Sequence, residues 1–146
     1  MRATARWATA IAAAWAGALL AIAFLAAPAA FATLQSADAG RVVSRLFAQE
    51  AALALAVALL LLFLEQRAAR RHAEAGRGSV MSVPTLLLLG TIFCTAAGYY
   101  AMQPLMAEAR LGRGNWSFAA LHAVSLGFYA LKTLLAVALV WRFSRD

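Results

Sequence analysis

The stretch FLAAPAAFATLQSADAG, residues 24–40, decides how many times this chain crosses a membrane. Its segment APAAFA places small residues at alternating positions after an apolar run, as at the end of a secretory signal peptide. The apolar run before Pro28, WATAIAAAWAGALLAIAFLAA (residues 7–27), exceeds the 7–15 residues or so that are usual in a signal peptide. It is also long enough to cross a bilayer. We therefore expect a retained first membrane helix and not a cleaved leader.

The composition of the whole chain points to a membrane protein. Of the 146 residues, 64% are hydrophobic and only 13% are charged, which is too little polar surface to cover a soluble globule. The formal net charge is +7, but the basic residues lie at the ends of apolar runs and form no stripe with interleaved aromatic residues. We therefore expect a lipid bilayer as partner and no nucleic acid. A single cysteine, Cys94, excludes an internal disulfide and a CxxC motif.

Four apolar runs are long enough to span a hydrocarbon core of about 30 Å as helices, at about 7–34, 40–65, 80–107 and 116–143. None alternates as a strand does, and a lone hairpin would leave backbone groups unsatisfied in lipid. The connectors are short, the longest being EQRAARRHAEAGRGS (residues 65–79), so there is no room for a second domain. The sequence predicts an all-α, polytopic four-helix transmembrane bundle that forms one domain, residues 1–146.

The arginines predict how this bundle is oriented. Four lie beside the first and third connectors: Arg41, Arg45, Arg110 and Arg113. Eight lie near the termini and the middle connector: Arg2, Arg6, Arg67, Arg70, Arg71, Arg77, Arg142 and Arg145. Because basic residues accumulate on the cytosolic side of membrane proteins, we expect both termini in the cytosol. We expect the protein to be a multi-pass protein of the bacterial inner (plasma) membrane.

Polar side chains inside the apolar runs are the candidate functional residues, because a membrane makes them expensive. They follow one helical face in the second and fourth spans and end the third. They comprise Arg41, Arg45, Gln49 and Glu50, then Gln103 and Glu108, then His122, Ser125, Tyr129 and Lys132. We expect a polar cluster in the outer half of the bundle, with Arg45 in the layer of His122 and neutralised by Glu50 or Glu108. A Glu50–Lys132 pair would require Lys132 to extend outward by most of its length, and the alternative is that it snorkels towards the cytosol.

Two functions fit these residues. The first is a non-enzymatic small transporter-like or accessory membrane component, whose polar cluster lines an outward-facing cavity or holds the helices in register. The second is binding or export of a soft metal ion such as Cu(I) by Met102, Met106 and His122, since thioethers and imidazole suit that ion. A purely structural role is the third possibility, because methionines fill gaps and polar contacts join membrane helices.

Catalysis and partners are the remaining questions. His122, Ser125 and Glu50 are residue types of a hydrolase triad, but there is no GxSxG motif and the serine and histidine share one helix face, so we expect no enzyme. A face of small residues in the third span, formed by Gly90, Cys94 and Gly98, suits close packing against a neighbour. That neighbour is either within the bundle or in a homo-oligomer or another membrane protein.

Three segments carry a resemblance to a known family: RVVSRLFAQE (41–50), QPLMAEAR (103–110) and FAALHAVSL (118–126). They resemble the polar signatures of the transmembrane protein 205-like membrane domain family, whose bacterial members are known as a domain of unknown function. The likeness covers nearly the whole chain and implies four spans with cytosolic termini. The vertebrate relative is associated with cellular handling of a platinum drug, which implies soft-metal export or trafficking.

The resemblance also assigns motif positions. It matches the basic-LF motif of the family to Arg45, Leu46 and Phe47, its proline near the end of the third helix to Pro104, and its histidine to His122. The chain departs from the pattern shortly afterwards. Several relatives carry an asparagine where this chain has Gly127, Phe128 and Tyr129, which puts a polar role for that position in doubt.

Overall fold

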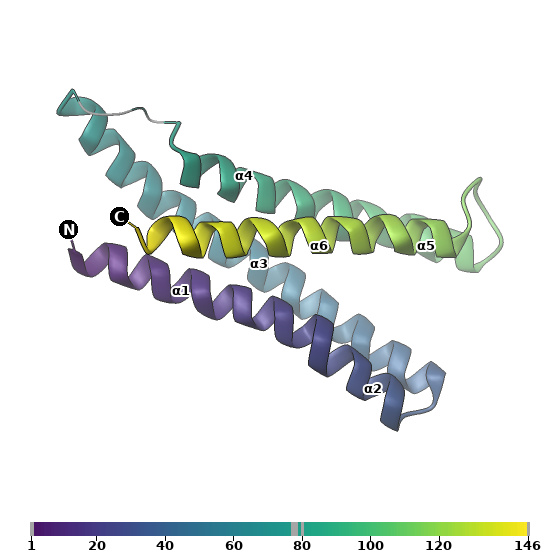
Figure 1. Ribbon diagram of the computed structural model, residues 1–146. Helices are drawn as coiled ribbons and strands as arrows, with labels where there is room; N and C mark the ends of the chain where they lie inside the picture. The colour runs from purple at the N-terminus through teal and green to yellow at the C-terminus, as the bar shows by residue number, and fades with distance from the viewer. Residues whose placement is uncertain (1, 77–78, 80, 146) are drawn as a thin grey trace.

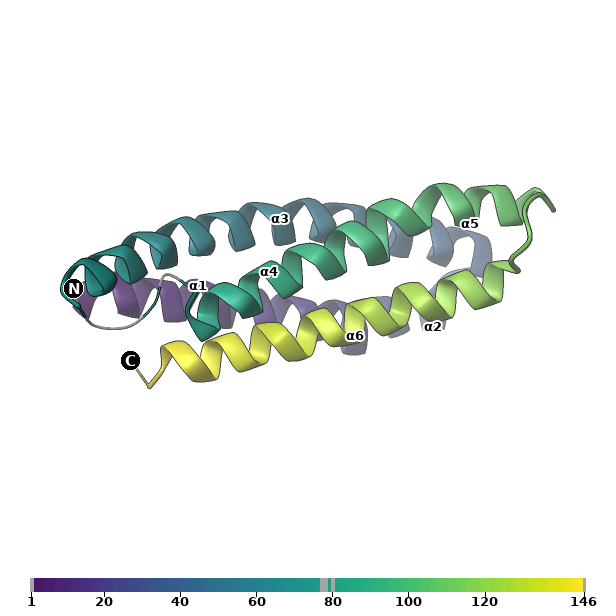
Figure 2. The ribbon, with the colours of Figure 1, turned by 90° about the horizontal axis from the view of Figure 1, so that it is seen from above.

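The computed structural model describes residues 2–76, 79 and 81–145, and within that part of the chain the regular structure is entirely helical. Four long helical rods run lengthwise beside one another (Figures 1 and 2). Both termini lie at the same end of the bundle as the connector between the second and third rods (Figure 1). Arg77 and the expected start of the third span at residue 80 lie outside the described residues.

Two of the rods are interrupted by a turn of π-helix. The first rod consists of α1 (Arg2–Ala21), η1 (Ile22–Ala26) and α2 (Ala27–Thr33), and the second is α3 (Ser36–Glu74). The third consists of α4 (Val83–Thr95), η2 (Ala96–Ala101) and α5 (Met102–Arg110), and the fourth is α6 (Phe118–Phe143). All four rods are long and apolar enough to cross a membrane, which confirms the predicted all-α fold with four spans.

The longest predicted connector is mostly helix. Helix α3 has 39 residues and continues to Glu74, so it is about 58 Å long and much longer than a hydrocarbon core. Residues 65–74 are mostly polar, yet alanine, glutamate, glutamine and arginine are all good helix formers. The loss of hydrophobicity therefore marks the edge of the expected membrane span and not the end of the helix.

Serine side chains begin the third and fourth rods. Ser82 Oγ accepts a hydrogen bond from the Thr85 N–H at 3.2 Å, and Ser117 Oγ accepts one from the Ala120 N–H at 3.2 Å. Such N-caps satisfy backbone donors that the first turn of a helix leaves free. Ser82 also donates to Glu65 Oε1 at 2.6 Å, which ties the start of α4 to the polar extension of α3.

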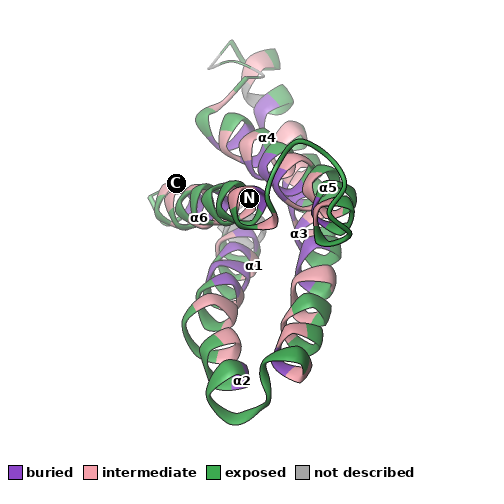
Figure 3. Ribbon diagram, turned by 90° about the vertical axis from the view of Figure 1, so that its right-hand side faces the viewer, coloured by how far each residue is buried: buried purple, intermediate pink, exposed green. Residues whose placement is uncertain are grey.

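The core of the bundle is formed by all four rods. Its buried members are mostly alanine and leucine, and the first rod supplies several of them, including Ala12, Trp15 and Leu19. Buried positions follow the sides on which the rods face one another, while large apolar side chains on the outer sides are exposed, as expected for a surface in lipid (Figure 3). At the end opposite the termini, α2 and α5 lie on opposite sides of the bundle (Figures 1 and 3).

Candidate functional site

A buried ion pair joins α3 to α6 in the middle of the bundle. The Lys132 ammonium donates hydrogen bonds to both carboxylate oxygens of Glu50, at 2.9 Å to Oε1 and 2.7 Å to Oε2. Each side chain is only 3% exposed. Both groups are therefore withdrawn from water and lipid, and each supplies the counter-charge that the other needs in a low-dielectric interior.

Tyr129 of α6 packs against the Lys132 ammonium of this pair. Its ring lies 4.9 Å from the Lys132 ammonium, and Phe47 of α3 meets the same ring edge-on at 5.1 Å. The Tyr129 hydroxyl donates a hydrogen bond to the Leu19 carbonyl at 2.8 Å, close to the start of η1. One residue thus contributes a cation–π contact, an aromatic contact and a hydrogen bond between helices.

Ser125 makes the corresponding link from α6 to η2. Its hydroxyl donates to the Gly98 carbonyl at 2.6 Å. The Met102 N–H donates to the Tyr99 carbonyl and not to Gly98, its partner in a regular α-helix, so this irregular turn directs the Gly98 carbonyl to the serine. A Cβ added at Gly98 would lie 2.3 Å from Phe128 Cβ, which shows how closely the two backbones approach.

The small-residue face of the third span is used within the chain. Gly90 faces Leu135 of α6, Gly98 faces Phe128, and Cys94 between them is buried. Of the two neighbours expected for this face, the structure shows the one inside the bundle. The close packing that the four-residue spacing predicts is thus supplied by α6.

The predicted polar cluster is divided between the core and the surface. Glu50, Tyr129 and Lys132 are brought together in the interior, and Ser125 is half-buried with its hydroxyl on the Gly98 carbonyl. Gln103 is half-buried, whereas Arg41, Arg45, Gln49, Glu108 and His122 are exposed. The expected single layer across three helices does not form, because the helices diverge towards the end at which these residues lie (Figure 3).

The acids in this region pair differently from the expectation for Arg45. Glu50 binds Lys132, and Glu108 binds Arg113 Nε at 2.9 Å on the surface. The prediction that one of them neutralises Arg45 is therefore wrong, and Arg45 has no acidic partner among the described residues. Arg41 does have one, since its guanidinium contacts the carboxylate of Asp38 one turn earlier on α3.

The three proposed metal ligands differ in their surroundings. Met106 is buried, Met102 is half-buried, and His122 is exposed with its ring stacked on Phe118 at a centroid distance of 5.8 Å. Among the described residues no group of three histidine, cysteine, aspartate or glutamate side chains is placed to hold a metal ion. Soft-metal binding by the two methionines and the histidine stays a prediction.

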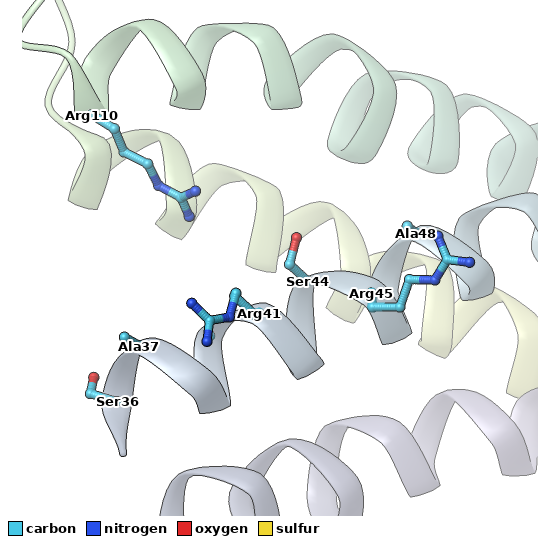
Figure 4. A pocket seen from close by; sticks show the side chains of 8 residues that line it. Ser36, Ala37, Arg41, Ser44, Arg45, Ala48 and Arg110 are labelled. Carbon is cyan, nitrogen blue, oxygen red and sulfur yellow. The ribbon is translucent and has the colours of Figure 1, made fainter. Parts of the chain in front are cut away.

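An arginine-lined pocket of about 610 Å³ opens at the end of the bundle opposite the termini. Its wall is a stripe along the first turns of α3, completed by one residue from the end of α5: Ser36, Ala37, Gly40, Arg41, Ser44, Arg45, Ala48 and Arg110. Figure 4 shows Arg110 extending towards the part of α3 that carries Arg41 and Ser44, with Arg45 one turn farther along. The Arg110 guanidinium also lies 4.6 Å from the Phe118 ring.

The sequence predicts that Arg41 and Arg45 line an outward-facing cavity or hold the helices in register, but it does not predict the neighbours that they have in this pocket. The signal missed was the stripe of Ser36, Gly40 and Ser44, which shares a face with the arginines at intervals of four. Arg110 was counted only as a topology signal. Its contact with Phe118 crosses a connector of seven residues, and nothing in the spacing indicates how that connector folds.

Comparison with known proteins finds one family. A family profile described as Domain of unknown function (DUF4149) matches residues 10–115, more than two thirds of the chain, which include Glu50 and the whole arginine-lined pocket but not α6. Neither the curated proteins nor the solved structures gave a match. The length of the profile match shows that this four-span chain belongs to the family described as Domain of unknown function (DUF4149).

Proposed function

We propose that this protein is a small, non-enzymatic, transporter-like membrane component whose charge-responsive element is the Glu50–Lys132 ion pair. The observation that carries the proposal is the burial of both charges between α3 and α6, each 3% exposed. Ionisable residues inside a membrane bundle are by default functional-site candidates, because charge is costly there.

The energetics favour a role beyond packing. Two apolar side chains of similar volume would fill the same space without the cost of removing two charges from water, and such replacements are often neutral or stabilising. What an apolar pair cannot do is respond to charge. Protonation of Glu50 would leave Lys132 without a counter-charge. A cation that displaces the Lys132 ammonium from the Glu50 carboxylate would do the same. Either event therefore favours separation of α3 from α6.

The irregular turns of the neighbouring rods support a mobile role for this level of the bundle. Helix α6 donates to the Leu19 carbonyl beside η1 and to the Gly98 carbonyl within η2. Single π-helical turns are frequent at functional sites. The polar face of α6 is thus attached to the two points at which the first and third rods depart from regular α-helix.

The hydroxyl of Ser125 supports the non-enzymatic part of the proposal. A nucleophilic serine gives its proton to an adjacent base, whereas Ser125 donates to a backbone carbonyl at 2.6 Å. His122 is stacked on Phe118, on the same helix. Ser125 and Glu50 thus take part in contacts between helices, and His122 in a contact within α6.

The orientation and the membrane are also part of the proposal. We infer cytosolic termini and a bacterial inner membrane from the excess of arginine at the terminal end, eight against four. The kinship to transmembrane protein 205-like proteins is supported by the positions of Arg45, Pro104 and His122 in the three resembling segments.

Ion flux into vesicles tests the proposed transport. The purified protein is reconstituted in vesicles and a potassium diffusion potential is applied. Proton entry is followed with an enclosed pH-sensitive dye, and sodium entry in separate vesicles with an enclosed sodium-sensitive dye. We expect flux above that of protein-free vesicles, and at least a tenfold loss in Glu50→Gln. Glu108→Gln is the matched control, because it removes an exposed acid, and its flux should equal that of the wild type.

A double variant separates transport from folding. Glu50→Leu with Lys132→Met removes both charges and leaves no unpaired partner, so the bundle should fold. Folded protein without flux supports the proposal. Wild-type protein that carries no proton or sodium flux, together with a double variant at least as stable, would instead show that the pair only holds the helices in register.

A further inference from the structure

We propose that the pocket lined by Arg41, Arg45 and Arg110 binds a phosphoryl group, either of a lipid headgroup or of a soluble phosphate. This site is separate from the Glu50–Lys132 pair, since neither of those residues lines the pocket. The inference therefore does not depend on the proposed transport function.

The charge of the pocket is the first argument. Three of its eight lining residues are arginines and none is acidic. Arg41 forms an ion pair with Asp38, but Arg45 and Arg110 have no acidic partner among the described residues. This end of the bundle carries four arginines and two acids, Asp38 and Glu108, and the second acid is taken by Arg113. The unbalanced positive charge is thus concentrated in the pocket.

The shape of the pocket is the second argument. The pocket is an open depression of about 610 Å³, larger than a single ion needs. Few side chains project from the α3 surface beside the arginines, because Ala37 and Ala48 carry only a methyl group and Gly40 has no side chain. A bulky group is thus able to approach the backbone of α3 closely.

The donors present suit a phosphoryl group in particular. A guanidinium offers a planar fork of N–H donors that binds two oxygens of one phosphate, and Arg41, Arg45 and Arg110 each offer such a fork. In the structure Arg45 extends along α3 towards Ala48, away from the other two (Figure 4). Two serine hydroxyls on the same face, Ser36 and Ser44, add neutral donors for remaining oxygens. The stacking of Arg110 against Phe118 orients its guanidinium before a ligand arrives, which lowers the entropic cost of binding.

The depth of the pocket matches the phosphate layer of a bilayer. Arg41 and Arg45 lie about 8 and 14 Å along α3 from Ser36, and Arg110 ends α5. Headgroup regions occupy roughly the outer 5–8 Å on each side of the hydrocarbon core. With Ser36 at the outer edge of the headgroup layer, Arg41 and Arg45 would lie near the boundary between headgroups and hydrocarbon, within reach of lipid phosphodiesters, while the open side of the pocket also admits a soluble phosphate.

Thermal unfolding in a maltoside detergent without phosphate tests the ligand class. Inorganic phosphate should raise the unfolding midpoint of the wild type more than chloride or acetate at equal ionic strength, since a ligand of the folded state stabilises it. Arg45→Gln and Arg110→Gln should each weaken the apparent affinity for phosphate by about tenfold or more. Arg113→Gln is the matched control, because it removes the same charge at the same end but outside the pocket.

Native mass spectrometry distinguishes the two sources of the phosphoryl group. The protein is mixed with phosphatidylglycerol or phosphatidylcholine, and retention of each lipid is compared between the wild type and the same three variants. Preferential retention of phosphatidylglycerol, lost in Arg45→Gln and Arg110→Gln, assigns a lipid headgroup. Stabilisation by phosphate without lipid retention assigns a soluble ligand.

The proposal is overturned by any of three results. These are equal stabilisation by acetate and phosphate, equal losses in Arg113→Gln and the two pocket variants, and no response to either phosphate or lipid. The helical content of Arg45→Gln and Arg110→Gln is checked by circular dichroism. If one of the two variants misfolds, the other still tests the proposal.

Discussion

Lys132 is the residue on which the interior of this bundle depends most. Its four-carbon stem brings the ammonium to both oxygens of Glu50 across the gap between α6 and α3. The sequence placed both groups inside spans but at different depths, and left the pair undecided. A depth counted along each helix leaves out the axial offset between the two helices and the length of the lysine side chain. Together these remove the expected difference in depth between Glu50 and Lys132.

Replacing one member of this pair should be costly. Lys132→Met leaves the Glu50 carboxylate buried without a counter-charge, so we expect the free energy of unfolding to fall by about 3–5 kcal/mol. Titration of the detergent-solubilised protein with sodium dodecyl sulfate measures this change. Arg113→Met provides the comparison, because its pair with Glu108 is more than half exposed and should be worth under about 1 kcal/mol. Similar losses in the two variants would contradict the burial of the pair.

Gly98 gives a second prediction at the scale of one residue. An alanine Cβ there would lie 2.3 Å from Phe128 Cβ, a clash that no side-chain rotation relieves. Gly98→Ala should therefore destabilise the protein by about 1–3 kcal/mol, as overpacking does. Gly127→Ala in α6 is the control, because nothing lies within 4 Å of the added methyl group and alanine is the better helix former. Its thermal midpoint should be unchanged or higher.

At the scale of elements, α6 is the helix to which the others are joined. It contacts the first rod through Tyr129 and Leu19, the second through Lys132 and Glu50, and the third through Ser125 and Gly98. The polar stripe of this helix is exposed at His122 and buried at Lys132. The regular spacing of the stripe in the sequence thus does not predict exposure, because burial increases along α6 from His122 to Lys132.

Loss of the link between α6 and the first rod should be measurable. Tyr129→Phe keeps the ring against Phe47 and Lys132 but removes the hydrogen bond to Leu19. We expect the free energy of unfolding to fall by about 0.6–1.5 kcal/mol, typical of hydrogen bonds between membrane helices. Tyr100→Phe removes an exposed hydroxyl from the third rod and should have no effect. A loss in Tyr100→Phe as large as that in Tyr129→Phe would show that the Leu19 contact is not responsible.

The elements were predictable from the sequence to the extent that hydrophobicity defines them. Runs of apolar residues located all four rods, because about 20 such residues are needed to cross the bilayer. They did not reveal the extension of α3 to Glu74, where polar helix formers continue the helix outside the lipid. Nor did they reveal η1 and η2, because hydrophobicity does not distinguish a turn of π-helix from the α-helix on either side of it.

The candidate site was predicted less completely than the elements for a related reason. Helical spacing shows that Arg41, Arg45 and Gln49 share a face, but not whether that face meets protein or the surroundings. The expected cluster assumed that the helices stay parallel to their ends. In the structure they diverge at that end, so Arg45 lines an open pocket while Glu50, one and a half turns deeper, meets Lys132.

For the whole molecule, the two ends of the bundle differ in charge. One end carries both termini and the connector after α3, where the sequence has eight arginines, and such a basic end suits contact with an anionic leaflet. The other end carries fewer arginines, and three of its four line a pocket. In the orientation that we propose, these arginines lie on the outer side, against the usual charge bias, and the proposed phosphoryl ligand is a local reason for them.

The orientation of the two ends is therefore the decisive prediction at this scale. In a Cys94→Ala background, single cysteines at Ser79 and Gly114 mark the connector after α3 and the connector before α6, on opposite ends of the bundle. Bacterial cells that express the protein are treated with a membrane-impermeant maleimide. The cells are intact, and the reagent reaches the outer face of their plasma membrane. Gly114→Cys should be labelled and Ser79→Cys should be labelled only after lysis, because the bias of basic residues to the cytosolic side predicts that the arginine-rich end faces the cytosol. The reverse pattern would place the pocket in the cytosolic leaflet, and labelling of both before lysis would mean that four spans do not form.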